Sequence, residues 1–417
     1  MTKIEIKNGI NLYLFPEKKF KTYYAGIHFH TPLNADTATE HALIPLILKR
    51  GSKNYPSKSA ISEKLDMLMG ASLSAFVQKK GESQLLSLSI SGVSDSFAPF
   101  GECFNEGINL LSDIALNPIL PFNEEYLSSE KKHLRDIIES EKNDKRHYSV
   151  SRCKEEMNKN TPYAVPENGY ADKIDEINSN SLEKRYLDII KTSPIDILIV
   201  GNFDEDAASK IISSCLLRLP ERDGNYPVTQ PSVPDDIFTV TESMEVSQGK
   251  LCIGFTTPVP SASSEDYPAL MVYNSIFGGG AHSKLFMNVR EKLSLAYYAG
   301  SSYERSKGII IVSSGIESKN FEKARDEIFL QHKSMTTGDI TDTELSVSKK
   351  ALINALKATG DSVGAIASFY LSSILQNITF SKEALAEKID KVTVDDVVRV
   401  GKSIAPKTIY FLKGADR

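Results

Sequence analysis

The sequence predicts an α+β protein built from two tandem halves of similar structure, each a sheet with helices packed on one face. Its 417 residues exceed the size of one ordinary hydrophobic core. A proline-rich stretch interrupts the periodicity near the middle of the chain, and strands and helices follow a similar order on either side of it. These observations together indicate duplication of one α+β unit.

The boundary between the halves is placed at residues 219–236, a polar stretch that contains Pro220, Pro227, Pro231 and Pro234. The predicted N-terminal half therefore covers residues 1–218. The predicted C-terminal half covers residues 237–417.

The first half opens with a predicted hairpin, in which alternating apolar residues flank a turn at Asn8-Gly9. Further alternation predicts strands at residues 22–31, 72–78 and 84–91, the last two as an antiparallel pair. Helical spacing of apolar residues predicts helices from residue 37 or 39 to 49, over 97–116 and from 123 to beyond 154. The half ends with a helix and a strand within residues 181–203.

The second half repeats this order. Strands are predicted at residues 238–246 and 250–257, followed by a helix from Glu265. A hairpin over 296–316 precedes helices at 320–334, 342–358 and 362–375. A helix and a strand again close the half, within residues 394–415.

The composition excludes several classes of function. The chain is 41% apolar and 25% charged, as in soluble globular proteins, and its net charge of −5 disfavours nucleic acid and anionic membranes as partners. It has no apolar signal-peptide core and no run near the ~18 apolar residues of a membrane helix. The four cysteines show no CxxC spacing, so a cytoplasmic protein with reduced thiols is expected.

The most informative stretch is FGGGAHSKLFMNVREKLSLAY, residues 277–297. It begins with three consecutive glycines, Gly278, Gly279 and Gly280. Without a Cβ these residues have access to φ > 0 and allow another chain to approach closely. Apolar residues at helical spacing predict a helix after them, and Ala296 begins a segment that favours a strand. Arg290 and Tyr297 are therefore predicted at the two ends of a helix-to-strand turn.

This stretch resembles the second-domain signature of the pitrilysin, insulin-degrading enzyme and mitochondrial processing peptidase family, and the resemblance covers essentially the whole chain. It implies two homologous halves, each a mainly antiparallel sheet with helices on one face, that enclose a chamber. In that family an Arg and a Tyr seven residues apart bind substrate near the zinc. The resemblance therefore implies that Arg290 and Tyr297 are the functional pair, and that Gly278, Gly279 and Gly280 bind substrate.

Chemically, a guanidinium and a phenol can donate hydrogen bonds to the oxygen that becomes negative when water adds to a peptide carbonyl. The alternative is an exposed Arg at a helix end and a half-buried Tyr.

Family members that hydrolyse peptides carry His-x-x-Glu-His on the first helix, where the two histidines bind Zn²⁺ and the Glu is the general base. A Lys-Gly-Thr turn follows, and it is matched here by Arg50-Gly51-Ser52. The family's spacing then places Ala42, Pro45 and Leu46 at the ligand and base positions. None of these side chains can bind zinc or move a proton. The helix is still expected, with Thr37 or Thr39 as its cap and a bend at Pro45.

The third ligand of the family, a Glu on a later long helix, aligns with Ile137, and Glu130 matches an upstream supporting glutamate. A second set of metal-binding residue types is His28 and His30, which point to one face of a strand, together with Glu40-His41. Glu40-His41 is out of register with the Arg50-Gly51-Ser52 turn, and isolated histidines are more often structural than ligating. Neither a phosphate-binding loop nor a GxSxG nucleophile motif is present.

The resemblance implies a non-catalytic subunit of a zinc metallopeptidase, inactive alone, because in related two-subunit enzymes one polypeptide holds the zinc motif and the other has lost it. The expected partner is a zinc-bearing paralogous peptidase subunit, so the zinc is expected in the partner and no metal in this chain. This chain would bind extended peptides at a sheet edge and supply Arg290 and Tyr297 to hydrolysis. The alternative is an inactive peptide-binding or scaffold homologue, a homodimer when alone. An autonomous enzyme has no visible nucleophile–base set to support it.

Overall fold

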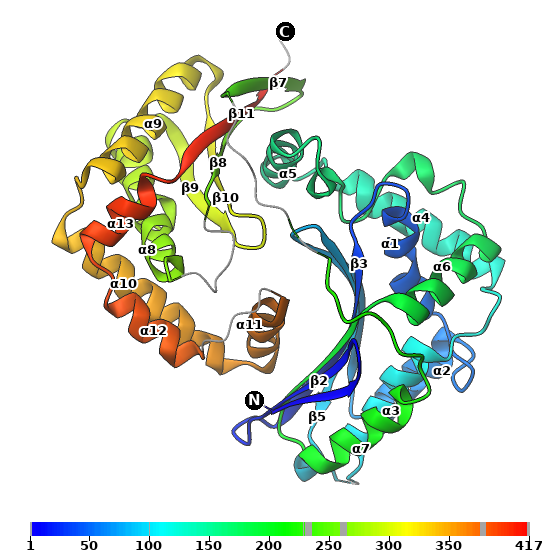
Figure 1. The fold of residues 1–417 in the computed structure, drawn as a ribbon. Helices are drawn as coiled ribbons and strands as arrows, with labels where there is room; N and C mark the ends of the chain where they lie inside the picture. The colour runs from blue at the N-terminus through cyan, green and yellow to red at the C-terminus, as the bar shows by residue number, and fades with distance from the viewer. Residues whose placement is uncertain are drawn as a thin grey trace. The chain divides into compact units, whose positions relative to one another are not determined.

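We describe residues 2–99, 101–227, 229, 236–258, 265–375 and 381–414 of a computed structural model of the chain (Figure 1). Within the predicted connecting segment 219–236, residues 228 and 230–235 lie outside the described residues. The same holds for residue 1 and residues 415–417, at the outer ends of the two predicted halves.

The chain forms two compact units that are not separated by a single cut. Unit 1 comprises Met1–Glu139, Val165–Val228 and Gly360–Leu371. Unit 2 comprises Ser140–Ala164, Thr229–Thr359 and Ser372–Arg417. Each unit contains one sheet, and the two units are described separately below.

The described strands of unit 1 form a six-stranded sheet in the order β1-β2-β6-β3-β5-β4. Neighbouring strands are antiparallel except β2 and β6, which are parallel. The strand bounds are β1 (Thr2–Lys7), β2 (Ile10–Pro16), β3 (Thr22–Pro32), β4 (Ser72–Lys80), β5 (Ser83–Val93) and β6 (Ile195–Gly201).

The described strands of unit 2 form a five-stranded sheet in the order β7-β11-β8-β10-β9, in which only β7 and β11 are parallel. The bounds are β7 (Phe238–Met244), β8 (Gly249–Thr256), β9 (Ala296–Glu304), β10 (Ile309–Ile316) and β11 (Ala405–Gly414). If β1 is set aside, the two sheets share one topology, since the first and fifth strands in chain order are the parallel pair in each. This common topology supports the duplication predicted from the sequence.

Seven α-helices belong to the first part of the described chain: α1 (Ala38–Leu48), α2 (Lys58–Met67), α3 (Cys103–Leu116), α4 (Glu124–Ser140), α5 (Lys145–Met157), α6 (Ser179–Thr192) and α7 (Glu205–Leu216). The second part contains α8 (Tyr267–Gly278), the π-helix η4 (Leu285–Lys292), α9 (Phe321–Thr337), α10 (Asp342–Ala358), α11 (Val363–Leu375), α12 (Lys382–Asp390) and α13 (Val394–Gly401). Short 3₁₀ helices are η1 (Asp95–Phe97), η2 (Pro162–Ala164), η3 (Ala171–Lys173), η5 (Ser318–Asn320) and η6 (Thr359–Asp361).

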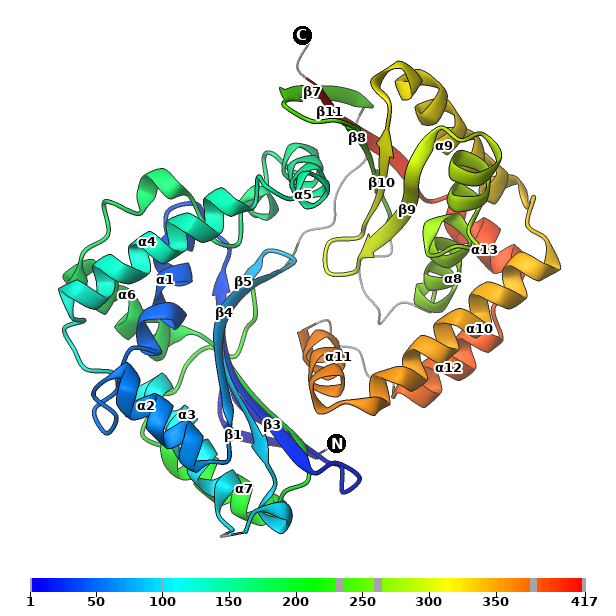
Figure 2. The same ribbon diagram turned by 180° about the vertical axis from the view of Figure 1, so that it is seen from behind.

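Helices cover one face of the first sheet, where they bury its main hydrophobic core (Figures 1 and 2). Alternation along each strand decides which side chains reach this core. On β3, for example, Ile27 and Phe29 lie in the core, whereas His28 and His30 point to the opposite face. The predicted α+β class, with mainly antiparallel sheets and helices on one face, is confirmed for this unit.

Two helices depart from this two-layer arrangement. In unit 1, Tyr370 of α11 stacks on Phe15 of β2, a residue outside the main core cluster. In unit 2, the departing helix is α5. The sequence predicts one helix from residue 123 to beyond 154, but the chain turns at residues 141–144, and the Asp144 carboxylate caps α5. Cys153 and Met157 of α5 then pack in a cluster with Cys252, Ile309 and Tyr410 of the second sheet. The second sheet is therefore covered by α8 and α9 on one face and by α5 on the other (Figures 1 and 2).

Candidate functional site

Helix α1 carries the residues that align with the metal-binding motif. Its N-cap, Thr37, makes no side-chain capping hydrogen bond, and the hydroxyl of Thr39 instead accepts from the backbone N–H of Tyr170 at 3.0 Å. The predicted capping interaction is therefore wrong. The helix continues through Pro45, which has no N–H to donate within the helix. Ala42 and Pro45 are buried, and Leu46 is partly exposed.

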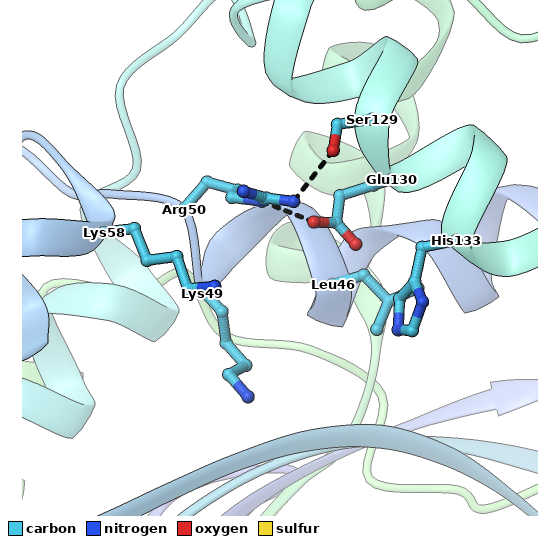
Figure 3. Close-up of a pocket in the computed structure, with 7 residues that line it drawn as sticks. All are labelled: Leu46, Lys49, Arg50, Lys58, Ser129, Glu130 and His133. Atoms are coloured by element: carbon cyan, nitrogen blue, oxygen red, sulfur yellow. Dashed lines mark hydrogen bonds and ion pairs between the residues drawn. The ribbon is translucent and has the colours of Figure 1, made fainter.

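A pocket of about 390 Å³ opens beside the exposed side of Leu46 (Figure 3). We call it the α1–α4 pocket. Its lining residues come from the end of α1, the start of α2 and the middle of α4: Leu46, Lys49, Arg50, Lys58, Ser129, Glu130 and His133. Of the four positions at which the family alignment expects zinc ligands or the base, Leu46 alone is among these lining residues.

The carboxylate of Glu130 in this pocket is paired with a cationic side chain of the same chain. The Arg50 Nε forms an ion pair with Glu130, and Arg50 Nη2 donates a hydrogen bond to Ser129 Oγ at 3.0 Å (Figure 3). Glu130 is buried, so removal of Arg50 would leave an unpaired carboxylate out of water. Arg50 belongs to the turn that follows α1, so this turn is fixed onto α4.

The alignment position of the third ligand, Ile137, lies seven residues after Glu130 on α4 and does not line the pocket. His133, three residues after Glu130, does line it. His133 belongs to none of the motifs found in the sequence. Its three-residue spacing from Glu130 is the signal that could have identified it, because residues three apart on a helix share a face.

The residues at this position do not fit a zinc ion. Aliphatic side chains stand at both histidine positions, proline stands at the base position, and Glu130 is paired with Arg50. Across the described part of the chain, no group of three His, Cys, Asp or Glu side chains is arranged to hold a metal.

The purified chain should accordingly contain no stoichiometric zinc. Elemental analysis after mild chelation is the measurement, with a family member that carries His-x-x-Glu-His treated in parallel as a positive control. About one tightly bound zinc per chain would contradict this expectation.

The predicted Arg and Tyr pair lies in unit 2, at the turn between η4 and β9. The segment over Leu285–Lys292 is a π-helix, and Ser294 has a left-handed φ of 48°. The guanidinium of Arg290 lies 4.5 Å from the ring centroid of Phe286, a cation–π contact that orients it. Tyr297, the second residue of β9, is 56% exposed.

Arg290 and Tyr297 line one pocket of about 350 Å³ in unit 2. We call it the η4–β9 pocket. Its other lining residues are Glu291, Ser294, Leu295, Ala296, Glu317 and Asn320. The two side chains of the predicted pair thus line one open hollow, and Arg290 Nε lies 3.4 Å from Glu291 Oε1.

Of the three glycines before this segment, Gly278 allows α8 to pack closely on β9. None of them has a positive φ, so the left-handed conformation considered from the sequence does not occur. A Cβ on Gly278 would lie 2.4 Å from the backbone N of Ser301 on β9, so the close approach expected there does occur, within this chain. Gly278, Gly279 and Gly280 do not line the η4–β9 pocket.

The histidines considered as a second metal set are split between the two faces of the first sheet. His28 and His30 lie on the face opposite the helices, where His30 Nε2 is 3.0 Å from Asp196 Oδ2. His41 lies in α1, where its Nδ1 is 3.0 Å from Gln84 Oε1, and Glu40 pairs with Arg185 at 2.7 Å. These three histidines therefore do not converge on one point, which excludes a metal site that combines them.

Asp196 is the centre of a buried polar network on that face. Besides His30, its carboxylate accepts hydrogen bonds from Asn11 Nδ2 at 3.1 Å and from the Tyr226 hydroxyl at 2.9 Å. Burial opposes ionisation, but the contact with His30 and the hydrogen bonds hold the pKa of Asp196 below its usual value. The ring of His30 also contacts the edge of Tyr226, with centroids 4.8 Å apart. Residue 226 of the connecting segment is thereby fixed to unit 1.

Two buried histidines should make stability depend on pH. Burial is the main cause that lowers the pKa of His28 to about 3 and that of His41 to about 4, so both are neutral in the folded chain. Below pH ~6.5 the unfolded chain binds protons that the folded chain does not. The free energy of unfolding should therefore fall as the pH is lowered from 6.5 to 5, by on the order of 1 kcal/mol per pH unit for each histidine.

Urea unfolding at several pH values measures this dependence, and His41→Gln should remove part of the slope. His133→Gln, which replaces a histidine at an exposed position, is the matched control. Equal slopes for the native chain and His41→Gln would contradict the assignment.

Comparisons with known proteins cover the whole chain. Residues 176–352 match the sequence profile described as "Peptidase M16 inactive domain". The chain is 34% identical to the "Probable inactive metalloprotease YmfF" of Bacillus subtilis (strain 168), over 98% of this chain and 96% of that protein.

Solved structures agree in fold. A conserved protein from Enterococcus faecalis V583 superposes with a TM-score of 0.91 at 29% identity, over 100% of this chain and 99% of that one. A peptidase M16 inactive domain from Pseudomonas fluorescens superposes with a TM-score of 0.80 at 15% identity, over 100% and 98%. Among the helices of the described residues, none has the length and apolar character needed to cross a membrane.

Proposed function

Because this chain belongs to the peptidase M16 family, we propose that it is a non-catalytic subunit that binds extended peptides and supplies Arg290 and Tyr297 to a zinc-bearing partner subunit. One observation carries the proposal: Arg290 and Tyr297 line one open pocket, while Ala42, Pro45 and Leu46 leave the metal position without donors. The printed name of the Bacillus subtilis relative, a probable inactive metalloprotease, agrees with loss of hydrolysis.

The edge strand β9 supports the peptide-binding part of the proposal. In the described sheet of unit 2, β9 pairs with β10 on one side, and no described strand pairs with its other edge, the kind of edge to which a peptide can add as a strand. Tyr297 lies on this strand. A peptide that pairs with β9 would bring its backbone carbonyls near the phenol of Tyr297 and the guanidinium of Arg290.

The chemistry of the pair supports a role during hydrolysis by the partner. Both side chains are donors, and both are accessible. Attack of a zinc-bound water on a peptide carbonyl places negative charge on its oxygen, which an Arg and a Tyr held at fixed positions would stabilise. The proton transfer and metal chemistry would belong to the partner.

The experiment is reconstitution. A family member with His-x-x-Glu-His from the same organism is assayed for hydrolysis of an unfolded peptide, alone and with this chain added at equal concentration. We expect this chain to have no activity alone and to raise the rate well above that of the partner. If the two chains form a complex by size-exclusion chromatography but the partner's rate of hydrolysis is unchanged, the scaffold alternative is favoured. A homodimer of this chain, with no complex with the partner, would favour that alternative further.

We also propose a cytoplasmic location. All four cysteines are free, and Cys103, Cys153 and Cys252 are buried. Reduced, packed thiols are typical of a reducing compartment.

A further inference from the structure

The α1–α4 pocket has the opposite charge from a metal site. Three of its seven lining residues, Lys49, Arg50 and Lys58, are cations, and Glu130 is the one acidic residue among them. The ion pair with Arg50 neutralises the negative charge of Glu130. The two lysines therefore leave about two uncompensated positive charges around a hollow of about 390 Å³.

The environment of Lys49 is unfavourable for a cation. Burial, followed by repulsion from Lys58, lowers the pKa of Lys49, although Glu130 acts in the other direction. Figure 3 shows the Lys49 side chain extending away from the Arg50–Glu130 pair. Within the described chain, neither Lys49 nor Lys58 forms an ion pair with a carboxylate. A bound anion would relieve the repulsion between the two ammonium groups.

The position of Lys58 adds to the positive potential. It is the first residue of α2, whose first turn carries no acidic residue. A helix has partial positive charge at this end, where a lysine is unfavourable and an anion is favourable. Lys58 therefore stands where it weakens its own helix but strengthens attraction for an anion in the pocket.

The remaining lining residues suit a small ligand with oxygen atoms. His133 offers a ring nitrogen from α4, and Leu46 provides an apolar wall where a metal ligand would stand in the hydrolytic family members. Ammonium and imidazolium groups recognise carboxylate and phosphate oxygens through charge-assisted hydrogen bonds.

We propose that the α1–α4 pocket binds an oxyanion, a carboxylate or a phosphate, held by Lys49, Lys58 and His133 beside Leu46. Two sources offer this chemistry: the C-terminal carboxylate of a bound peptide, and free inorganic phosphate. Binding of a peptide carboxylate depends on the proposed peptide-binding function, whereas binding of inorganic phosphate does not.

The first measurement uses inorganic phosphate. Thermal unfolding of the full chain is followed with increasing sodium phosphate and with sodium chloride at equal ionic strength. Phosphate should raise the melting temperature beyond the chloride series, because a ligand that binds the folded state stabilises it. Lys49→Met and Lys58→Met should each weaken the apparent affinity about tenfold or more, since each removes a charge-assisted hydrogen bond.

Lys53→Met is the matched control, because Lys53 is an exposed lysine on the adjoining turn that does not line the pocket. It should leave the phosphate response unchanged. Circular dichroism without phosphate shows whether each variant is folded, and Lys58 is exposed, so at least that variant should fold normally. A phosphate response equal to that of chloride, or one that persists in both pocket variants, would overturn the proposal.

The second measurement identifies the source with two unfolded peptides of one sequence, one ending in a free carboxylate and one in an amide. If the carboxylate is the ligand, the free-acid peptide should bind Lys49→Met about tenfold more weakly than the native chain, while the amidated peptide binds both equally. Equal binding of both peptides to both chains, with a positive phosphate result, assigns the pocket to phosphate. If neither peptide binds, the proposed peptide-binding function fails, and the phosphate result still decides whether the pocket is an oxyanion site.

Discussion

Replacement of Arg290 by alanine should lower the peptide turnover of the reconstituted complex by on the order of 10²-fold or more, equivalent to roughly 3 kcal/mol. Arg290 lies over the ring of Phe286 and lines the η4–β9 pocket with Tyr297. If it donates to the developing oxyanion, its loss removes an interaction made in the transition state. Turnover at saturating peptide is therefore the quantity to measure.

Tyr297→Phe should have an effect in the same direction, because it removes the phenol donor and keeps the ring. Lys292→Ala is the matched control, since Lys292 is an exposed cation two residues from Arg290 that does not line the pocket. Size and stoichiometry of each complex must equal those of the native complex. Native turnover in both Arg290→Ala and Tyr297→Phe would remove the shared-site mechanism and leave a scaffold.

Replacement of Asp196 by alanine should lower the free energy of unfolding by about 3–5 kcal/mol. Its carboxylate, fully buried on β6, is the common partner of His30, Asn11 and Tyr226. The substitution leaves those polar groups out of water without their acceptor, and each buried polar group that loses its partner carries a desolvation cost.

Urea unfolding at pH 7, with the slope and the midpoint both fitted, measures the loss. Asp188→Ala on α6 is the control, because Asp188 is largely exposed and its contact with Arg185 is 3.7 Å long. We expect a change near zero there. A loss below 1 kcal/mol for Asp196→Ala would mean that the network around Asp196 contributes little to stability.

Much of the fold follows from local sequence patterns. Alternation predicts the β1–β2 hairpin around Asn8-Gly9 and the β9–β10 hairpin, and both are confirmed with antiparallel pairing. These elements are set by residues close in sequence, so a local pattern is sufficient. The start of α3 was predicted six residues too early, because positive φ values at Gly101 and Glu102 end any helical path before Cys103.

What the patterns miss depends on contacts between distant residues. The break between α4 and α5 places Cys153 in one cluster with Cys252, 99 residues later in the chain, and the spacing of apolar residues cannot predict that contact. The π-helical form of η4 is likewise missed, because its apolar spacing is that of an ordinary helix. Spacing from the Arg50-Gly51-Ser52 turn assigns Leu46 to a ligand position, and the alignment of the later long helix assigns Glu130 to a supporting one. That they share a pocket with Lys49, Lys58 and His133 depends on the packing of three helices.

The path of the chain between the two units restricts how the protein can be divided. Besides the connection near residue 228, the segment 140–164 leaves unit 1 for unit 2, and the segment 360–371 does the reverse. A recombinant fragment that begins at residue 237 would lack α5 and would expose Cys252, Ile309 and Tyr410 to water. A fragment that ends at residue 218 would carry α5 with its apolar side unpaired and would lack Tyr370, whose ring stacks on Phe15 at 4.0 Å. The two halves, although similar in topology, should therefore aggregate when expressed separately, and co-expression of both fragments should restore solubility.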